Sequence, residues 1–429
     1  MKQQDNDISV LDFKNKKFYM LIVVLFFIIV VIIYGIINQE RESPKEEVLR
    51  IIENIKSHYG ERVETLRKTS LYYQESGEYQ KVGEVASNVL LELDKIDINP
   101  DTKYFKLKNN HYYLEYQDVI RTDKEISKNL RYQNYVLFNE NVITKNNFTL
   151  YQDGKEKYVF YKSFEFPIII KDYKNSYFVE YDSELFSIKK EDIKEIIKKT
   201  NTTKKNQNEI TTLAYHQVGD DGEICEDAYV CITKENFDKE MKYLKDNNYF
   251  TLTMEELYQY LNGNLQIDKG IVLTFDDGFK TKSMIEILEK YDLMGTIFVI
   301  TKYFDTMDEF QSKNLLVQSH TNNMHRNYVC SGGNQGGAML CASEKDIKDD
   351  LEISIKKIGN DLWAMAYPFY DYNEKAIRMV QEAGFKMSFI GRGNAMGKAT
   401  PLKTNLYKIP RMTVWNISIM NFNTWKSYL

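Results

Sequence analysis

Histidine, cysteine and concentrated basic charge are all scarce in this chain of 429 residues. The 57 lysines and arginines are outnumbered by 62 aspartates and glutamates, and the two signs are interspersed. A nucleic-acid-binding protein needs a concentrated basic face, so we expect no nucleic-acid partner. The four cysteines lack the spacing typical of zinc sites, which favours a structural role, either as free thiols or in disulfides. Four cysteines allow three different disulfide pairings, and the sequence does not choose among them. The cysteines are Cys225, Cys231, Cys330 and Cys341.

A long run without any charge extends from Phe18 to Ile37 near the N-terminus. Its length suffices for a helix that crosses a bilayer. Lysines precede it, which predicts a cytoplasmic tail at residues 1–17 and an extracytoplasmic remainder. A cleavable signal peptide is the alternative, but its apolar part is shorter and ends in small residues. We therefore expect a single-pass protein of the cell membrane, anchored through residues 18–37.

Residues 45–200 predict a helix followed by an aromatic-rich β module. Apolar residues recur at helical spacing in Glu46–Lys68. From about Lys103 to Ile197, short alternating segments rich in tyrosine and phenylalanine favour strands. The part Phe166–Ile193 resembles a small SH3-like barrel with strands paired around Lys174-Asn175. Its rings either stack on a wall glycan or form the core of the module.

A polar linker at Thr200–Glu209 separates this module from residues 210–429, which form the next predicted domain. In that domain strand-like runs and helical periods alternate, which predicts an α/β fold with a parallel barrel. Capping boxes at Thr253/Glu256 and Asp371/Glu374 predict two helix starts, and Gly384 predicts a helix end.

Chemically versatile side chains stand at the predicted strand ends of this domain. Reactive groups of parallel barrels gather at the carboxyl ends of the strands. Asp-Asp-Gly alone is usually a turn, and a single histidine is usually structural. The joint pattern nevertheless predicts a metal site with a base and an acid. Its members are Asp276-Asp277 after an apolar run, His216 after Leu213-Ala214-Tyr215, and His320 and His325 after another strand.

Two imidazoles and one carboxylate leave open positions on a divalent ion. Such an ion lowers the pKa of a bound water from 15.7 to about 7, and a second carboxylate beside the ligating one takes the proton of the water. This donor set suits zinc, and iron(II), cobalt and nickel remain open.

Three segments resemble the motifs of the polysaccharide deacetylase family, which has NodB homology and is also called carbohydrate esterase family 4. Thr274-Phe275-Asp276-Asp277-Gly278 is similar to the first motif, His320 to His325 to the second, and Ala366-Tyr367-Pro368-Phe369 to the third. The likeness covers about Thr211 to Leu429 and implies a deformed (β/α) barrel of about seven strands.

The same resemblance implies roles for the residues. Asp277, His320 and His325 hold zinc or another divalent transition metal, and Asp276 is the base. The oxyanion of the tetrahedral intermediate is held by the metal and a backbone N–H in the segment of Tyr367, Pro368, Phe369 and Tyr370.

Departures from the commonest family pattern point to one branch. The two histidines are one residue further apart, which is similar to poly-N-acetylglucosamine deacetylases with a permuted arrangement, in which the acid histidine precedes the aspartate pair. His216 fits that position. Ala366 replaces the usual arginine of the third motif and Tyr370 the usual glycine. Arg411 either orients Asp276 in place of that arginine or is merely structural.

The resemblance implies a metal-dependent de-N-acetylase of an N-acetylglucosamine-containing cell-wall or surface polysaccharide, either peptidoglycan or poly-N-acetylglucosamine. The expected partner is therefore an N-acetylated glycan. An O-acetyl carbohydrate esterase with the same donor set is one alternative. A non-catalytic wall-glycan-binding protein is another, although a binding module has no need for a base and an acid together.

Overall fold

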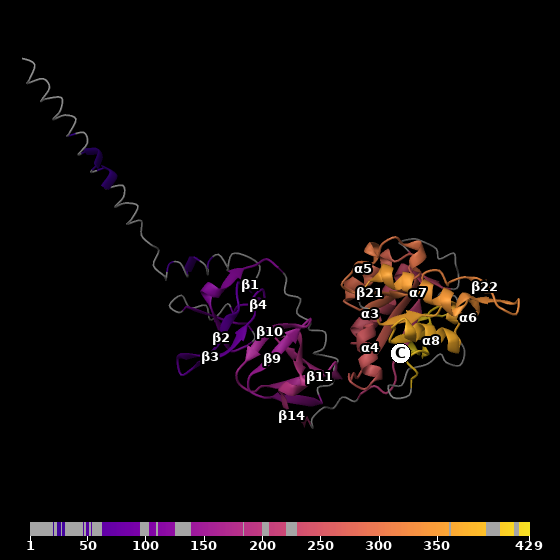
Figure 1. The fold of residues 1–429 in the computed structure, drawn as a ribbon, viewed down its shortest axis with the longest axis horizontal. Coiled ribbons are helices and arrows are strands. Elements are labelled where there is room, and N and C mark those ends of the chain that lie inside the picture. The colour runs from indigo at the N-terminus through magenta and orange to yellow at the C-terminus, as the bar shows by residue number, and fades with distance from the viewer. Residues whose placement is uncertain are drawn as a thin grey trace, which may run out of the picture. The chain divides into compact units, whose positions relative to one another are not determined.

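A computed structural model describes single positions between Met20 and Glu53 and most of the chain from Arg62 onward (Figure 1). Cys225 and most of the predicted anchor at residues 18–37 lie outside the described residues. Within the described part, no helix combines the length and apolar character that a bilayer crossing requires. The described ranges are 62–94, 103–108, 110–124, 139–182, 184–199, 206–219, 230–359, 362–391, 404–415 and 420–429.

The chain divides into two compact units, of which the first holds residues up to Ile126 together with Lys157–Val159. The helix expected to reach Lys68 is wrong at its end, because Arg62–Thr65 pair as a strand with residues 90–92 and 119–121. Ser76 and Gly77 both have positive φ, as a two-residue hairpin turn between β2 and β3 requires. The strands are β1 (Arg62–Thr65), β2 (Thr69–Glu75), β3 (Glu78–Val85), β4 (Leu90–Glu92), β5 (Tyr104–Lys106), β6 (Tyr112–Glu115) and β7 (Val119–Arg121), with a 3-10 turn η1 (Tyr116–Asp118).

The second unit begins with antiparallel strands in the order β14-β8-β11-β12-β13-β9. The hairpin predicted at Lys174-Asn175 is confirmed, and the SH3 likeness stays a prediction. Phe148, Phe160 and Phe186 are almost fully buried, so these rings form the core of the module. The elements are β8 (Glu140–Thr144), β9 (Phe148–Gln152), β10 (Lys155–Phe160), β11 (Glu165–Tyr173), β12 (Ser176–Tyr181), β13 (Glu184–Lys189), η3 (Lys190–Asp192) and β14 (Ile193–Lys198). The middle of β10, Lys157–Val159, belongs to the first unit.

Strands and helices then alternate to the C-terminus, as the sequence predicts. The elements up to the aspartate pair are β15 (Thr211–Tyr215), β16 (Gln217–Val218), β17 (Cys231–Ile232), α3 (Lys234–Asp246), β18 (Phe250–Thr251), α4 (Met254–Leu261) and β19 (Gly270–Asp277). Those up to the disulfide-linked hairpin are α5 (Lys282–Tyr291), β20 (Gly295–Val299), η4 (Thr301–Tyr303), η5 (Asp308–Phe310), β21 (Leu315–Ser319), β22 (Asn327–Val329) and β23 (Gln335–Gly337). The remainder are α6 (Ala338–Cys341), α7 (Glu344–Ile358), β24 (Ala364–Ala366), η6 (Pro368–Tyr370), α8 (Glu374–Glu382), β25 (Met387–Ile390), β26 (Ile409–Pro410), β27 (Met412–Thr413) and α9 (Phe422–Lys426).

A parallel sheet nearly closes into a barrel in this domain. Its order is β26-β25-β24-β21-β20-β19-β15-β27. The two end strands, β26 and β27, are separated along the chain by Arg411 alone, and they pair in parallel with β25 and β15. Residues 409–413 thus link the two edges of the sheet through the chain, and the predicted parallel barrel is confirmed as a nearly closed one.

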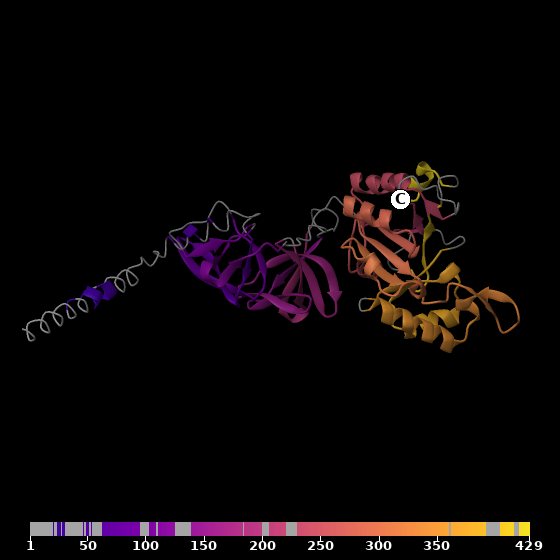
Figure 2. The ribbon, with the colours of Figure 1, turned by 90° about the horizontal axis from the view of Figure 1, so that it is seen from above.

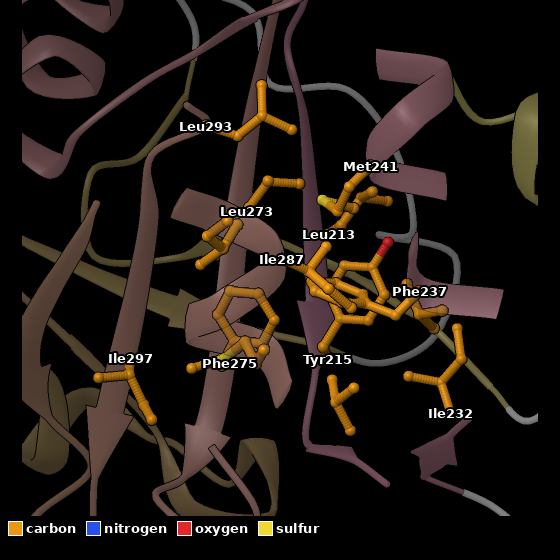
Figure 3. Packing of buried hydrophobic residues seen from close by; sticks show 14 of the residues in the cluster. Leu213, Tyr215, Ile232, Phe237, Met241, Leu273, Phe275, Ile287, Leu293 and Ile297 are labelled. Atoms are coloured by element: carbon orange, nitrogen blue, oxygen red, sulfur yellow. The ribbon is translucent and has the colours of Figure 1, made fainter. Parts of the chain in front are cut away.

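Apolar side chains fix the barrel strands and the helices around them. In β19 every residue from Gly270 to Asp276 is buried, as expected of a strand covered on both faces. Figure 3 shows Phe237 and Met241 of α3 gathered beside Leu213 and Tyr215 of β15. In Figure 2 the strands lie between a salmon group of helices and an orange and yellow group.

Two of the three predicted helix boundaries are confirmed. Thr253 and Glu256 form the capping box of α4. Gly384 follows α8 with a φ of 95°, which glycine adopts without strain. The capping box at Asp371/Glu374 is wrong, because the side chain of Asn373 caps α8 instead, by accepting from the N–H of Ala376.

The β module packs on the barrel domain at the amino ends of its strands. Ile169 and Ile170 of β11 belong to one apolar cluster with Phe250 and Leu265, which precede or begin the barrel strands. The N–H of Lys171 also donates to the carbonyl of Asn264. The predicted reactive residues stand at the other, carboxyl ends of the strands.

Candidate active site

The adjacent aspartates at the end of β19 point to different partners. Asp276 is 1% exposed and faces Arg411, whereas Oδ1 of Asp277 lies near His320 and His325. Asp277 has a φ of 73°, a left-handed conformation that is uncommon for residues other than glycine. Strain of this kind gathers at functional sites and persists only where the surrounding structure enforces it. The left-handed turn therefore separates two carboxylates that are neighbours in sequence.

Asp277, His320 and His325 form a group suited to a metal ion. One ligand atom from each lies within 4.8 Å of the others, and Nε2 of each histidine is 3.6 Å from Oδ1 of Asp277. That oxygen is buried and has no hydrogen-bond partner within the described part of the chain. A buried carboxylate oxygen without a partner is costly unless a cation compensates it. The three residues therefore fit a divalent cation.

The protonation states favour the same conclusion. Burial lowers the pKa of His320 to about 3 and also lowers that of His325, so both imidazoles are neutral near pH 7, as metal ligands must be. Burial and the charge of Asp276 raise the pKa of Asp277 to about 6. Nδ1 of His320 lies 2.9 Å from the carbonyl of Ala366, and as a donor it leaves Nε2 free to bind a metal.

Arg411 holds Asp276 in a fully buried, bidentate ion pair. Nη1 donates to Oδ1 at 2.7 Å and Nη2 donates to Oδ2 at 2.8 Å, while Nη1 also reaches Oγ1 of Thr274 at 3.2 Å. Burial alone would raise the pKa of Asp276, but the charge of Arg411 outweighs it and holds that pKa well below its usual range. Asp276 is therefore ionised under physiological conditions.

His216 approaches Asp276 from the end of β15. Its Nε2 is 4.0 Å from Oδ2 of Asp276, and its side chain is 16% exposed. Its Nδ1 is buried and finds no hydrogen-bond partner among the residues that the structure describes. The structure thus brings His216 to the same carboxylate that Arg411 holds, across a long stretch of sequence.

The segment Tyr367 to Tyr370 offers one free backbone donor among the described residues. The N–H of Tyr367 donates to Phe389 and that of Tyr370 to Tyr367, and Pro368 has none. The N–H of Phe369 has no acceptor in the described part of the chain. Phe369 and Tyr370 both have positive φ, and the Phe369 ring lies 4.2 Å from that of His325, centroid to centroid. Phe369 is therefore the candidate oxyanion donor.

Two features of this site escaped the sequence analysis. Gly391 leaves room for the ring of Tyr370, which a Cβ there would meet at 2.3 Å, so a distant glycine accommodates the unusual third motif. Asp350 of α7 accepts hydrogen bonds from the loop between His320 and His325. Its only signal in the sequence is a polar residue on the apolar side of a predicted helix.

A disulfide joins Cys330 to Cys341, which decides one of the pairings that the sequence left open. It ties the hairpin β22–β23 to α6, just after His325 in the chain. Cys231 is also disulfide-bonded.

A family model described as polysaccharide deacetylase matches residues 264–388. The chain carries a polysaccharide deacetylase domain. The matched part of this domain includes Asp276, Asp277, His320 and His325, but His216 and Arg411 lie outside it. The fold brings these two residues to the matched motifs.

The chain spans only part of the length of the curated relatives that it matches. One is YxkH of Bacillus subtilis (strain 168), named for the same family, which is 25% identical over 36% of this chain and 57% of the relative. Another is a poly-beta-1,6-N-acetyl-D-glucosamine N-deacetylase of Staphylococcus aureus (strain MRSA252), 26% identical over 43% of this chain and 67% of the relative. A solved de-N-acetylase from Aggregatibacter actinomycetemcomitans is 20% identical over 51% of this chain and 99% of that chain, with a TM-score of 0.43.

Proposed function

We propose that the chain removes N-acetyl groups from an N-acetylglucosamine polymer, with zinc or another divalent transition metal. One observation carries this proposal: the residues that could hold a metal lie beside the residues that could act as base and acid. The donor set of Asp277, His320 and His325 stands beside the ionised Asp276, with His216 at 4.0 Å. The names of the curated relatives support a glycan amide as the substrate.

Asp277, His320 and His325 would hold the cation. When bound there, it supplies a Lewis acid for the acetamide carbonyl and makes a water acidic enough to attack near pH 7.

Protein groups carry the proton transfers. Asp276 accepts a proton from the attacking water, and Arg411 keeps its carboxylate ionised and oriented. As the carbonyl oxygen becomes negative, the N–H of Phe369 donates to it. His216, in its protonated form, delivers a proton to the leaving nitrogen as the carbon–nitrogen bond breaks. Water is consumed, and acetate and a free sugar amine are released.

Exposed rings near these residues support a polymeric glycan as substrate. Phe279, two residues after Asp277, is 39% exposed, Tyr303 is 57% exposed and Phe369 is 41% exposed. The rings of Phe279 and Tyr303 are 5.5 Å apart, centroid to centroid. Such rings suit the apolar C–H faces of pyranose rings. We propose that Phe279 and Tyr303 bind sugar units next to the one that is deacetylated.

We further propose an extracytoplasmic location at the cell membrane, on the strength of the apolar run at residues 18–37. This location would bring the domain to peptidoglycan or to a surface polysaccharide, and the choice between these two glycans is left to the experiment below.

Acetate release tests the proposed reaction. The purified chain is incubated with β-1,6-linked N-acetylglucosamine oligomers, with chitooligosaccharides and with muropeptides, each with and without a chelator. Mass spectrometry should record the loss of acetyl groups, and the chelator should abolish it. Acetylated xylan serves as the ester control. Release from xylan alone would replace the proposal with an O-acetyl esterase, and no release from any glycan at saturating zinc would refute both.

A further inference from the structure

Helix α7 carries three polar side chains on the side that it packs against the barrel domain. Asp350, Ser354 and Lys357 are spaced so that they follow one line along the helix. Asp350 is 7% exposed and Ser354 is 0% exposed, beside the buried Leu351. Buried polar groups destabilise a fold unless they have partners. The hydrogen-bond partners of Asp350, Ser354 and Lys357 therefore indicate the role of this side of α7.

Asp350 binds the loop that connects the two histidines of the donor set. Its Oδ1 accepts from the N–H of Asn322 at 2.8 Å, and its Oδ2 accepts from the N–H of Asn323 at 2.8 Å. Each carboxylate oxygen thus fixes one peptide group between His320 and His325. Hydrogen bonds to an ionised acceptor are stronger than those between neutral groups.

Ser354 reaches the bend that follows His320. Its Oγ lies 2.8 Å from Oγ of Ser319, which in turn accepts from the N–H of Thr321 at 3.0 Å. Thr321 has a φ of 69°, and its own Oγ1 accepts from the N–H of Met324 at 3.1 Å. A β-branched residue in this conformation is strained, so the surrounding hydrogen bonds must hold it there.

Lys357 joins the neighbouring turn to the same helix. Its Nζ donates to the carbonyl of Thr301 at 2.7 Å and to that of Phe304 at 3.1 Å. The N–H of Thr301 donates to the carbonyl of Thr321 at 3.1 Å. The turn after β20 and the loop after β21 are therefore held as one assembly by α7.

We infer that α7 positions the metal-binding histidines, and that Asp350 is the positioning residue through which it does so. The inference rests on the metal site of the proposed function. Within the described residues, neither His320 nor His325 forms a hydrogen bond with α7. The helix instead fixes the start of the loop at Ser319 and its middle at Asn322 and Asn323, and so sets the separation and direction of the two imidazoles before a cation binds.

Cobalt titration of Asp350→Asn in the full chain tests the inference. Asparagine keeps the shape but turns an amide NH₂ toward one of the two N–H groups. Asp349→Asn is the matched control, because Asp349 lies one position away and forms an ion pair with Lys345 on the same helix. We expect Asp350→Asn to weaken Co²⁺ binding by about 10- to 100-fold and to change its visible absorption spectrum, with Asp349→Asn like the parent chain.

A merely structural role predicts a different result. If Asp350→Asn melts at a lower temperature but binds Co²⁺ with the parent affinity and spectrum, the inference is wrong. Ser354→Ala is measured in the same titration and should weaken binding by about threefold or more, since it removes one partner of Ser319. If Asp350→Asn fails to fold, parent-like binding by Ser354→Ala overturns the inference.

The parent chain separates this inference from the proposed reaction. Failure of the parent chain to bind Co²⁺ refutes both. Tight Co²⁺ binding by the parent chain that Asp350→Asn weakens, without acetate release from any glycan, refutes the proposed reaction and supports the role of α7.

Discussion

Arg411 binds both carboxylate oxygens of Asp276, at 2.7 and 2.8 Å, although the two residues are 135 positions apart in the chain. Arg411 also stands between β26 and β27, where the two edges of the barrel meet. The residue that orients the proposed base is therefore part of the closure of the fold. Arg411 thus places beside Asp276 the positive charge that the alanine at position 366 of the third motif cannot provide.

Arg411→Lys should shift the acidic limb of the pH profile of kcat/KM to higher pH. Arg411 lowers the pKa of Asp276, and a lysine, whose single ammonium group cannot bind both carboxylate oxygens in the same way, lowers it less. A larger fraction of Asp276 is then protonated, and so inactive as a base, at a given acidic pH. We also expect kcat/KM near pH 7 to fall by about tenfold or more, since a bidentate pair is lost. Arg326→Lys, at an exposed arginine, is the control. An unchanged acidic limb would mean that Arg411 does not tune Asp276.

His216→Ala should keep the metal and lose turnover. His216 lies outside the donor set, so metal content measured by mass spectrometry should equal that of the parent chain. Loss of a general acid typically lowers kcat by about 10²- to 10⁴-fold. His111→Ala, at an exposed histidine in the first unit, is the control. Full activity of His216→Ala would remove this residue from the mechanism.

Glu240→Gln should flatten the pH dependence of stability between pH 4.5 and about 8. Glu240 of α3 is buried, and the hydroxyl of Tyr215 donates to its Oε2 at 2.8 Å while accepting from Nε1 of Trp425 at 3.0 Å. Burial raises the pKa of Glu240 from 4.5 to about 8. The folded state thus holds a proton that the unfolded state releases, so the contribution is fully present below pH 4.5 and is lost as the pH rises to about 8.

Urea unfolding at several pH values measures this effect. The free energy of unfolding of the parent chain should fall more steeply with pH than that of Glu240→Gln, by up to about 1.4 kcal/mol per pH unit within this range. Lys234→Gln on the same helix is a control at a partly exposed position. Parallel curves for the parent chain and Glu240→Gln would show that Glu240 is ionised in the folded protein.

Tyr303→Ala should raise KM for long oligomers more than for a single sugar unit. Its ring is proposed to bind a neighbouring unit, which a monosaccharide lacks, whereas the donor set is untouched. We expect an increase in KM of about 5- to 30-fold with oligomers and little change in kcat, because the lost contact is made equally in the ground and transition states. Ile353→Ala removes another exposed apolar side chain, on α7, as the control. An equal effect on all substrate lengths would contradict a separate subsite.

Local signals were sufficient to predict most elements of the barrel domain. The apolar run of β19, the helical periods of α3 and α5 and the capping box of α4 depend on neighbours within a few residues. The same local reasoning failed where two nearby residues could each cap the same helix. Asp371 and Asn373 both precede α8 and both can cap it, and the fold selects Asn373.

The sequence by itself determined which residue types are available at the strand ends: two adjacent carboxylates and three histidines in a half that has no others. Tertiary structure decided their assignment. Only closure of the barrel brings Arg411 to Asp276, only the left-handed turn at Asp277 directs the second carboxylate toward the histidines, and only packing of α7 places Asp350 behind their loop. The physical reason is that ligation, ion pairing and positioning act over a few ångströms in space, between residues that the sequence separates by tens to more than a hundred positions.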